Sequence, residues 1–363
     1  MIPKKNKELS LSPAKYNSMK RKFLSRKVKP VEVTPKSLDG LLKAMGETGF
    51  QGKTLAETLN VWEAMARDPN TTILLGYAGS MSTTGQWKII KWLVKNRYVD
   101  AIVSTGANIS EDVVEAMGYH YYQGSPVADD AALLKCDIDR YYDVYVDDLQ
   151  YAKMMDFISD FLETLDPKYS YSSAEFLHEF GKYQAKHGVD SITTEAYRQN
   201  VPVFSPAMVD SAYGESATWL RWKKGKEVNV NQFKDFYQLA DIGKKAKGTS
   251  VVYIGGGVPK DTIQLITVMQ EFFAGYPEFR EIAPHDYAIQ ITTDSPQWGG
   301  LSGCTFEEAI SWGKISTKAK RAVCYCDATI ALPILSHGLL ERLGGKPRKG
   351  GDLSWVFDGL PNK

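Results

Sequence analysis

The sequence predicts an α/β protein: a single large domain built on a doubly wound, mostly parallel sheet. Short β-branched runs alternate with amphipathic stretches along most of the 363 residues. A hydrophobic fraction of 43% is enough for a substantial buried core. Because each run of strand type is followed by a stretch of helix type, the connections are those of βα units, which place their strands in parallel.

The expected elements follow one another in pairs from residue 71 onward. A strand at 71–77 precedes a helix at 86–96, and a strand at 101–104 precedes a helix at 111–117. A strand at 202–204 comes next, and a strand at 250–254 leads into a helix at 260–273. Strands at 287–292 and 322–325 and a final helix at 331–343 complete the domain.

The two ends of the chain differ from the middle in composition. Residues 1–34 are basic and interrupted by prolines, which predicts a flexible or draped arm, with nucleic-acid binding a minor alternative. Residues 346–363 form a tail whose aromatics, Trp355 and Phe357, are suited to docking it on the main domain at 35–345.

The charge and cysteine content narrow the class of protein. A net charge of +1 gives no general attraction to nucleic acid or to an anionic membrane, and no apolar run is long enough for a membrane span. Four cysteines without a close-spaced framework are typical of free thiols in a cytoplasmic protein. We expect no metal site, because the five histidines are scattered and the acids at 137–148 lack the glycine and glutamate of a calcium-binding loop.

Three of the expected strands end in turns with little side-chain bulk, at 76–85, 104–108 and 255–257. In parallel sheets ligands bind at these strand ends, where bare backbone and the next helix can receive a phosphate. Glycine also serves tight turns for conformational reasons alone, and none of the three has the full Gly-x-Gly-x-x-Gly pattern. Three such turns in one sheet nevertheless favour a nucleotide or dinucleotide ligand, and the absence of a P-loop pattern from these turns argues against an ATPase.

Lys314 follows a short predicted helix that opens with a capping box at Thr305 and Glu308 and stops at Gly313. A partly dry position beside Trp312 disfavours a charged ammonium, so a fraction of neutral amine could attack a carbon electrophile and form an imine. Lysines near helix C-termini are also common because they complement the helix dipole. The local pattern alone therefore favours a structural lysine.

A wider set of residues decides whether Lys314 is a structural or a catalytic lysine. The set comprises Phe204-Ser205-Pro206-Ala207, Asp210, Gly214, Gly255-Gly256-Gly257, the run from Glu308 to Ile315, and Asp327-Ala328. In this order the residues resemble deoxyhypusine synthases and the homospermidine synthases derived from them, most of all the bacterial deoxyhypusine synthase-like branch. The resemblance extends from about residue 70 to residue 340.

The resemblance implies a Rossmann-like fold, with 35–345 as the NAD-binding catalytic domain, and an NAD-dependent aminobutyl transfer. NAD oxidises spermidine, diaminopropane leaves, and the aminobutyl imine passes to Lys314, then to an amine acceptor, where the new imine is reduced. The implied cofactor-binding residues are Ser80, Thr83, Thr84, Thr105, Gly106, Glu111, Asp210, Gly256, Gly257, Asp327 and Ala328. The implied substrate residues are Glu215, Asp261, Glu308 and Trp312. A homotetramer with active sites shared across a dimer interface is also implied.

Four positions depart from the family pattern and bear on the acceptor. Trp298 and Leu301 replace two family aspartates, Asp261 replaces a histidine, and Glu215 replaces an aspartate. The first three departures slightly favour a free diamine such as putrescine, which gives homospermidine, over the lysine of the translation factor, which gives deoxyhypusine. Two alternatives stay open: a dinucleotide-binding protein that has lost transfer chemistry, and, less favoured, a plain dehydrogenase.

Overall fold

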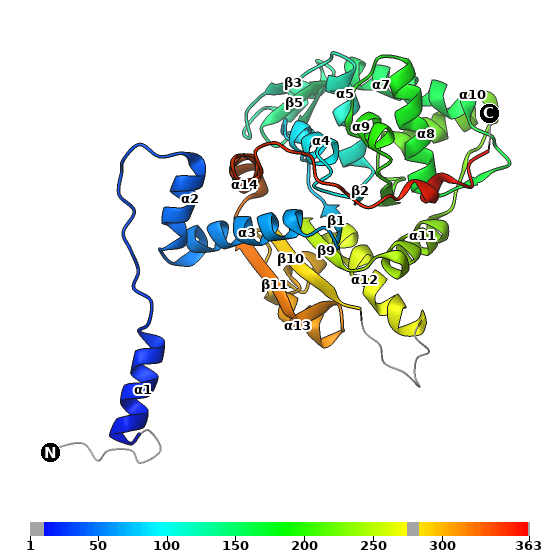
Figure 1. The fold of residues 1–363 in the computed structure, drawn as a ribbon. Coiled ribbons are helices and arrows are strands. Elements are labelled where there is room, and N and C mark those ends of the chain that lie inside the picture. The colour runs from blue at the N-terminus through cyan, green and yellow to red at the C-terminus, as the bar shows by residue number, and fades with distance from the viewer. Residues whose placement is uncertain (1–10, 274–282, 362–363) are drawn as a thin grey trace.

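A six-stranded sheet, parallel at every pairing, forms the centre of the computed structural model, which describes residues 11–273 and 283–361 (Figure 1). Its strands are β1 (Thr72–Tyr77), β2 (Ala101–Thr105), β7 (Val203–Ala207), β9 (Thr249–Ile254), β10 (His285–Thr292) and β11 (Ile315–Tyr325). They lie in the order β7-β2-β1-β9-β10-β11, which is 3-2-1-4-5-6 when counted along the chain. The order reverses between β1 and β9, so a ligand crevice is expected where these two strands end.

Helices lie on both faces of this sheet. The helices before β7 are α1 (Pro13–Phe23), α2 (Leu38–Gly46), α3 (Phe50–Arg67), α4 (Trp87–Lys95), α5 (Asp112–Ala116), α6 (Asp130–Leu134), α7 (Asp148–Thr164), α8 (Ser173–Lys186) and α9 (Ile192–Gln199). Those after it are α10 (Ala212–Lys224), α11 (Gln232–Lys245), α12 (Gly257–Phe273), α13 (Phe306–Ser311) and α14 (Ala328–Leu343). Alternate residues of β1 pack into two separate clusters: Ile73 and Leu75 join side chains of α3 and α14, whereas Leu74 joins side chains of α11, α12 and α13.

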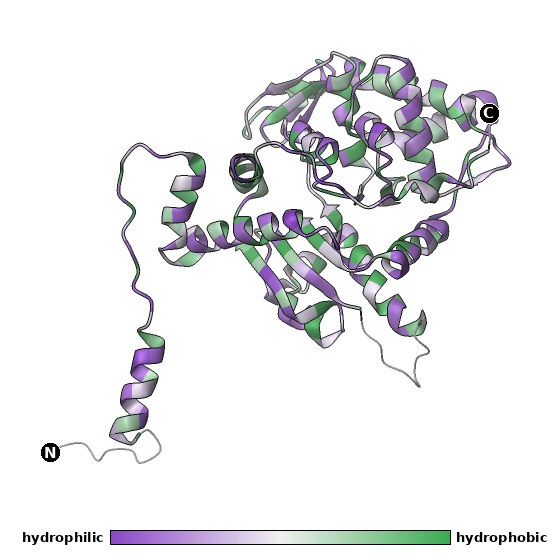
Figure 2. Ribbon diagram, viewed as in Figure 1, coloured by the Kyte–Doolittle hydropathy of each residue, from purple (hydrophilic) through white to green (hydrophobic). Residues whose placement is uncertain are grey.

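Burial on both sides explains why the central strands are mostly apolar, and green predominates in several of the strands near the centre of Figure 2. Every residue of β9 is buried, and β1 is buried from Ile73 to Tyr77. This arrangement confirms the predicted α/β class and the mostly parallel sheet.

The edge strand β11 differs most from its prediction. It begins at Ile315, directly after Lys314, and not at 322. Its first half carries Lys318, Lys320 and Arg321, which a strand paired on one side alone can expose to solvent. Because its first half is polar, this part of β11 was not predicted from the sequence. The strand places Lys314 at the edge of the sheet. Two helices also begin earlier than predicted, α12 at Gly257 and α14 at Ala328, where the Asp327 side chain accepts a hydrogen bond from the Thr329 N–H.

The segment between β2 and β7 contains most of what the sequence did not predict. The short strands β3 (Tyr121–Gln123), β4 (Ile138–Tyr141) and β5 (Val144–Asp147) form an antiparallel sheet, and β5 contacts α7. A further pair, β6 (Ser170–Tyr171) and β8 (Asn229–Val230), is parallel.

The described parts of the two tails behave differently. Residues 11–37 are exposed, and α1 stands apart from the rest of the molecule, with Pro13 in its first turn (Figure 1). The C-terminal tail instead crosses the body: Leu353 and Val356 are buried, and Phe357 stacks on His178 with 3.8 Å between ring centroids. The docking role expected of Trp355 and Phe357 is confirmed, since the Lys245 ammonium lies 3.3 Å from the Trp355 ring centroid. Among the described helices, none is both long and apolar enough to cross a membrane.

Candidate active site

Lys314 lies between α13 and β11, and the residues of α13 and Gly313 fix the position of its backbone. Thr305 and Glu308 form the predicted capping box of α13, and Gly313 has a φ of 71°, which lets the chain leave the helix. The Lys314 N–H donates to the Ala309 carbonyl at 2.9 Å, which holds its backbone against the helix end. The side chain is 11% exposed, and its Nζ lies 3.3 Å from Asp261 Oδ1 and 5.4 Å from the Trp312 ring centroid.

Two of the four predicted substrate residues, Asp261 and Trp312, contact the lysine side chain, and a third, Glu308, lies on the helix that leads to it. Asp261 comes from α12, and Trp312 and Glu308 come from the α13 segment. The Glu308 carboxylate is occupied in the isolated chain, because its Oε2 accepts hydrogen bonds from the Thr305 N–H at 2.8 Å and the Thr305 hydroxyl at 3.0 Å. These hydrogen bonds hold the pKa of Glu308 below its usual value.

Lys260, which the sequence analysis did not single out, is buried beside this group. Its Nζ donates to Gln290 Oε1 at 3.0 Å and to the Cys304 carbonyl at 2.5 Å. Burial lowers the pKa of the Lys260 ammonium to about 8. A signal was present in the sequence, since Lys260 directly precedes Asp261 and follows the glycine triplet, but a single lysine in that place is not specific.

A second group of predicted residues lines an open groove of about 870 Å³. Ser80, Thr83 and Thr84 enter it from the turn after β1, and Asp327 enters it from the start of α14. The opposite wall is formed by β3, β4 and β5 and includes Tyr121 and Tyr141. Four of the residues implied for cofactor binding are thus brought together by the fold.

Asn108 links two of the small-residue turns by hydrogen bonds. Its Oδ1 accepts the Met81 N–H at 3.0 Å, its carbonyl accepts the Ser82 hydroxyl at 2.5 Å, and its Nδ2 donates to the Thr105 hydroxyl at 3.3 Å. The turn after β1 is therefore fixed to the turn after β2. Sequence reasoning placed Asn108 in a turn but gave it no role.

The other cofactor candidates lie around the same strand ends. Glu111 is buried behind the groove wall, where burial raises the pKa of its carboxyl group to about 7 although a hydrogen bond with Tyr141 opposes the shift. Gly106 is closely packed, since a Cβ there would lie 2.5 Å from the Ser211 hydroxyl oxygen. Asp210 is exposed in the turn after β7 and lines neither this groove nor the pocket described next.

The glycine triplet combines close packing with open space. A Cβ on Gly256 would lie 2.4 Å from Ser302 Cα, so the loop before α13 lies directly on this turn. Gly257 has a φ of 61° and nothing within 4 Å of a Cβ position, so its backbone is open to an approaching group. Ala328, half-buried, follows Asp327 at the start of α14.

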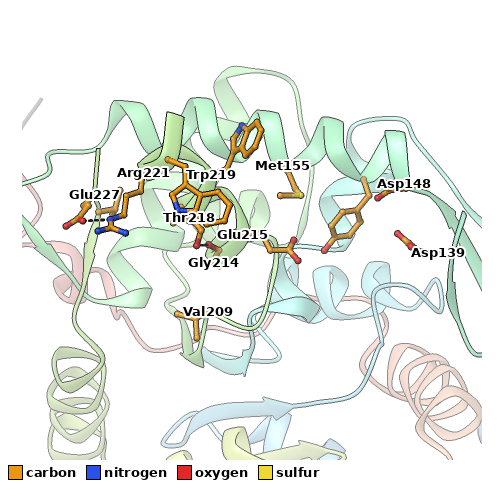
Figure 3. Close-up of a pocket in the computed structure, with 14 residues that line it drawn as sticks. Asp139, Asp148, Met155, Val209, Gly214, Glu215, Thr218, Trp219, Arg221 and Glu227 are labelled. Carbon is orange, nitrogen blue, oxygen red and sulfur yellow. Dashed lines mark hydrogen bonds and ion pairs between the residues drawn. The ribbon is translucent and has the colours of Figure 1, made fainter. Parts of the chain in front are cut away.

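Glu215 lies elsewhere, in an acidic and aromatic pocket of about 900 Å³ (Figure 3). Asp139 and Asp148 lie at one end of the pocket, and Arg221 and Glu227 form a 2.6 Å ion pair at the other (Figure 3). Burial and the charge of Asp148 raise the pKa of Asp139. Further lining residues include Tyr151, Trp219 and Trp222, but not Lys314. The acids at 137–148, expected to be a solvated segment, therefore contribute two carboxylates to a pocket.

Fold and site together define an α/β protein with a lysine-centred site at the edge of a parallel sheet. Comparison with known proteins then identifies the family: residues 40–339 match the deoxyhypusine synthase family. A "probable deoxyhypusine synthase 2" from Methanosarcina mazei is 42% identical over 90% of this chain and 93% of its own length. A "probable deoxyhypusine synthase 2" from Archaeoglobus fulgidus is 46% identical over 82% of this chain and 96% of its own length. A bacterial "deoxyhypusine synthase-like protein" from Coxiella burnetii is 36% identical over 93% of this chain and 94% of its own length.

A solved structure agrees at the level of the fold. The crystal structure of a "putative deoxyhypusine synthase" from Entamoeba histolytica superposes with a TM-score of 0.62 at 17% identity, covering 89% of this chain and all of that one. The chain therefore belongs to the deoxyhypusine synthase family, and membership implies an aminobutyl transferase. The expected resemblance is confirmed.

Proposed function

We propose that the protein is an NAD-dependent enzyme that cleaves spermidine and transfers the aminobutyl group, through an imine on Lys314, to an amine acceptor. The observation that carries the proposal is the lysine itself, which is largely shielded and whose Nζ lies 3.3 Å from Asp261 Oδ1 and over the ring of Trp312. A carboxylate beside the amine can accept a proton or hold a second ammonium group, and the indole face favours cationic substrates.

The residues of the groove fit a dinucleotide. The strand order 3-2-1-4-5-6 is that of Rossmann-like dinucleotide-binding sheets, and the turns after β1 and β9 lie at the reversal point. Ser80, Thr83 and Thr84 offer hydroxyls, Asp327 offers a carboxylate for ribose hydroxyls, and the volume of about 870 Å³ is sufficient. NAD, when bound, supplies the oxidation of the C–N bond of spermidine and the later reduction of the product imine.

The chain's own residues perform the transfer between these two redox events. The Lys314 amine adds to the imine carbon, the bond to diaminopropane breaks, and the leaving nitrogen takes the proton that Lys314 gives up. The acceptor amine then adds to the same carbon and displaces Lys314. The carboxylates of Asp139, Asp148 and Glu215 are suited to holding the remaining ammonium groups.

The separation of Lys314 from the acidic pocket supports a shared active site. Lys314 is not among the residues lining the pocket that contains Glu215. We therefore propose a homotetramer in the cytoplasm, in which Lys314 of one protomer completes the pocket of its partner. This arrangement is the one that the resemblance implies.

The acceptor that we favour is putrescine, giving homospermidine, ahead of the translation-factor lysine, which gives deoxyhypusine. Trp298 and Leu301, at positions where the family pattern has aspartates, are 72% and 45% exposed on the loop before α13. The same two residues favour, as a second candidate, a dinucleotide-binding protein without transferase activity.

A trapping experiment separates these candidates. The purified protein is incubated with NAD and spermidine labelled in its aminobutyl group, then reduced with borohydride and digested for mass spectrometry. We expect a labelled Lys314 peptide, its loss in Lys314→Arg, and its retention in Lys318→Arg, which alters an exposed lysine on β11. Putrescine and the translation factor, added separately, then show which acceptor receives the label.

Each other outcome has a distinct meaning. Absence of the adduct, of diaminopropane and of both products shows that the transferase proposal is wrong and leaves the dinucleotide-binding candidate. Steady NADH release that survives Lys314→Arg indicates a dehydrogenase.

A further inference from the structure

The hairpin between β4 and β5 carries an aromatic side chain at its tip, where a small residue would fit better. Tyr141 pairs with Val144, so Tyr142 and Asp143 alone form the loop. Tyr142 has a φ of 57°, a left-handed conformation that two-residue hairpin loops usually fill with glycine, asparagine or aspartate. A tyrosine is strained in this conformation, and burial does not compensate for the strain because the residue is 71% exposed. The fold alone therefore does not explain why a tyrosine stands here.

Contacts on both sides hold the hairpin tip in this conformation. The Arg140 guanidinium donates to the Tyr142 carbonyl at 2.9 Å and is itself fixed by two hydrogen bonds to the Asp130 carboxylate, at 2.5 and 2.7 Å. On the other side, the Gly124 N–H donates to the Asp143 carbonyl at 2.8 Å. The backbone that carries the tyrosine ring is therefore fixed before a ligand binds, which lowers the entropy that binding would cost.

Tyr142 lines the groove of about 870 Å³, on the wall opposite the turn at 80–84. Tyr141 and Val144 belong to the same wall, whereas the hydroxyls of the turn and the Asp327 carboxylate lie across the groove from it. Hydroxyls and a carboxylate suit the phosphate and ribose groups of a nucleotide. The flat base is then left to the hairpin wall, where an exposed phenol ring offers a face for stacking.

The base that suits this wall is the one that takes no part in the reaction. Among the described residues that line the groove, none belongs to the Lys314 site or to the acidic pocket. The nicotinamide ring has to lie beside the amine that it oxidises, and the residues proposed to bind that amine are in those two other groups. The hairpin wall is therefore suited to the adenine ring.

We propose that Tyr142 binds the adenine ring of NAD by stacking, and that the hairpin between β4 and β5 is a preformed platform for the adenosine half of the cofactor. This inference rests on the proposed function, because it takes NAD as the ligand of the groove. It adds the residue that orients the adenosine half. Stacking uses the face of the ring, so the phenol hydroxyl is not required.

The test is the affinity of the full-length protein for parts of the cofactor, measured by isothermal titration calorimetry. The probes are NAD, ADP-ribose, which lacks the nicotinamide, and nicotinamide mononucleotide, which lacks the adenosine half. In Tyr142→Gly we expect the affinity for NAD and for ADP-ribose to fall about tenfold, and the affinity for nicotinamide mononucleotide to stay unchanged. Glycine adopts the same φ without strain, so the thermal unfolding temperature of this variant should not fall.

Two further variants separate the ring from its backbone conformation. Tyr142→Phe retains the ring and should bind all three probes as the wild type does. Phe50→Gly is the matched control, because Phe50 is also an exposed aromatic residue with a positive φ, of 55°, but does not line the groove. This change should leave all three affinities as they are.

Wild-type affinity for ADP-ribose in a folded Tyr142→Gly protein would overturn the role of Tyr142 alone. An equal loss of affinity for all three probes would also overturn it, because such a loss indicates a general distortion of the groove. A failure of the proposed function looks different: the wild-type protein then binds neither NAD nor ADP-ribose, which overturns the proposed cofactor and the role of Tyr142 together.

Discussion

Asp112 is a fully buried carboxyl group whose protonation couples folding to pH. Its Oδ2 accepts the Ile192 N–H at 2.6 Å and so holds the start of α9, whereas its Oδ1 has no partner among the described residues. Burial raises the pKa of Asp112 from 3.8 to about 7. The folded chain therefore keeps a proton that the unfolded chain releases, and the resulting stabilisation is complete below pH 3.8 and is lost as the pH rises through about 7.

Replacing Asp112 with asparagine should remove this dependence. The amide keeps the oxygen that accepts from Ile192 and carries no charge at any pH. We expect the free energy of unfolding to rise by about 1–3 kcal/mol at pH 8 and to stay unchanged at pH 4. Guanidinium denaturation at the two pH values measures the difference, with Asp160→Asn, an exposed change on α7, as the control. An equal gain at both pH values would show that the carboxylate charge is not responsible.

The residues that the sequence predicted are those whose role depends on local order. Lys314, Glu308 and Trp312 lie within seven positions of one another, and their motif is continuous. Lys260 and Asn108 escaped prediction because their roles depend on partners brought by the fold: Lys260 bonds to Cys304, 44 positions away, and Asn108 accepts from Met81, 27 positions away. Contacts between residues so far apart in the sequence cannot be predicted from the residue type at either position.

At the scale of the element, the capping box at the start of α13 links helix stability to the lysine site. The Thr305 hydroxyl accepts the Glu308 N–H at 3.1 Å, and the Glu308 carboxylate returns a hydrogen bond to the Thr305 backbone. Because α13 has six residues, the loss of one cap affects the whole element. The orientation of Lys314 follows, since its N–H bonds to Ala309 within this helix.

We expect Thr305→Ala to lower the free energy of unfolding by about 1 kcal/mol and to slow formation of the Lys314 adduct. Thr305→Ser, which retains the hydroxyl, should behave as the wild type in both measurements. Thermal unfolding gives the first quantity, and the rate of borohydride-trapped adduct gives the second. A stability loss with an unchanged adduct rate would separate the cap from the site.

The elements that the sequence predicted well are those with one environment along their length. Strand β9 is buried throughout and β1 is buried from Ile73 onward, and both strands were predicted within one residue of their bounds. The first half of β11 was missed because a polar strand at a sheet edge has the composition of a loop. The antiparallel sheet of β3, β4 and β5 was missed because its strands of three or four residues are mostly exposed or half-buried.

At the scale of the whole molecule, the predicted site residues form separate groups. Lys314 with Asp261 lies at the edge of the sheet, the groove with Ser80 and Asp327 lies at its carboxyl ends, and Glu215 lies in the acidic pocket. The transfer that we propose needs an amine-binding pocket beside the reactive lysine. A second copy of the chain supplies that proximity if Lys314 of one protomer faces the Glu215 pocket of the next.

Mixing two inactive variants tests this arrangement. Lys314→Arg and Glu215→Ala are each expected to abolish transfer on their own. When the two chains are co-expressed with different tags, a mixed dimer with shared sites has one site carrying both changes and one carrying neither. Random pairing makes half of the dimers mixed, so about a quarter of the wild-type activity should return. If each active site lies within one chain, every site keeps a defect and the mixture stays inactive, so the activity of the doubly tagged fraction decides between the two arrangements.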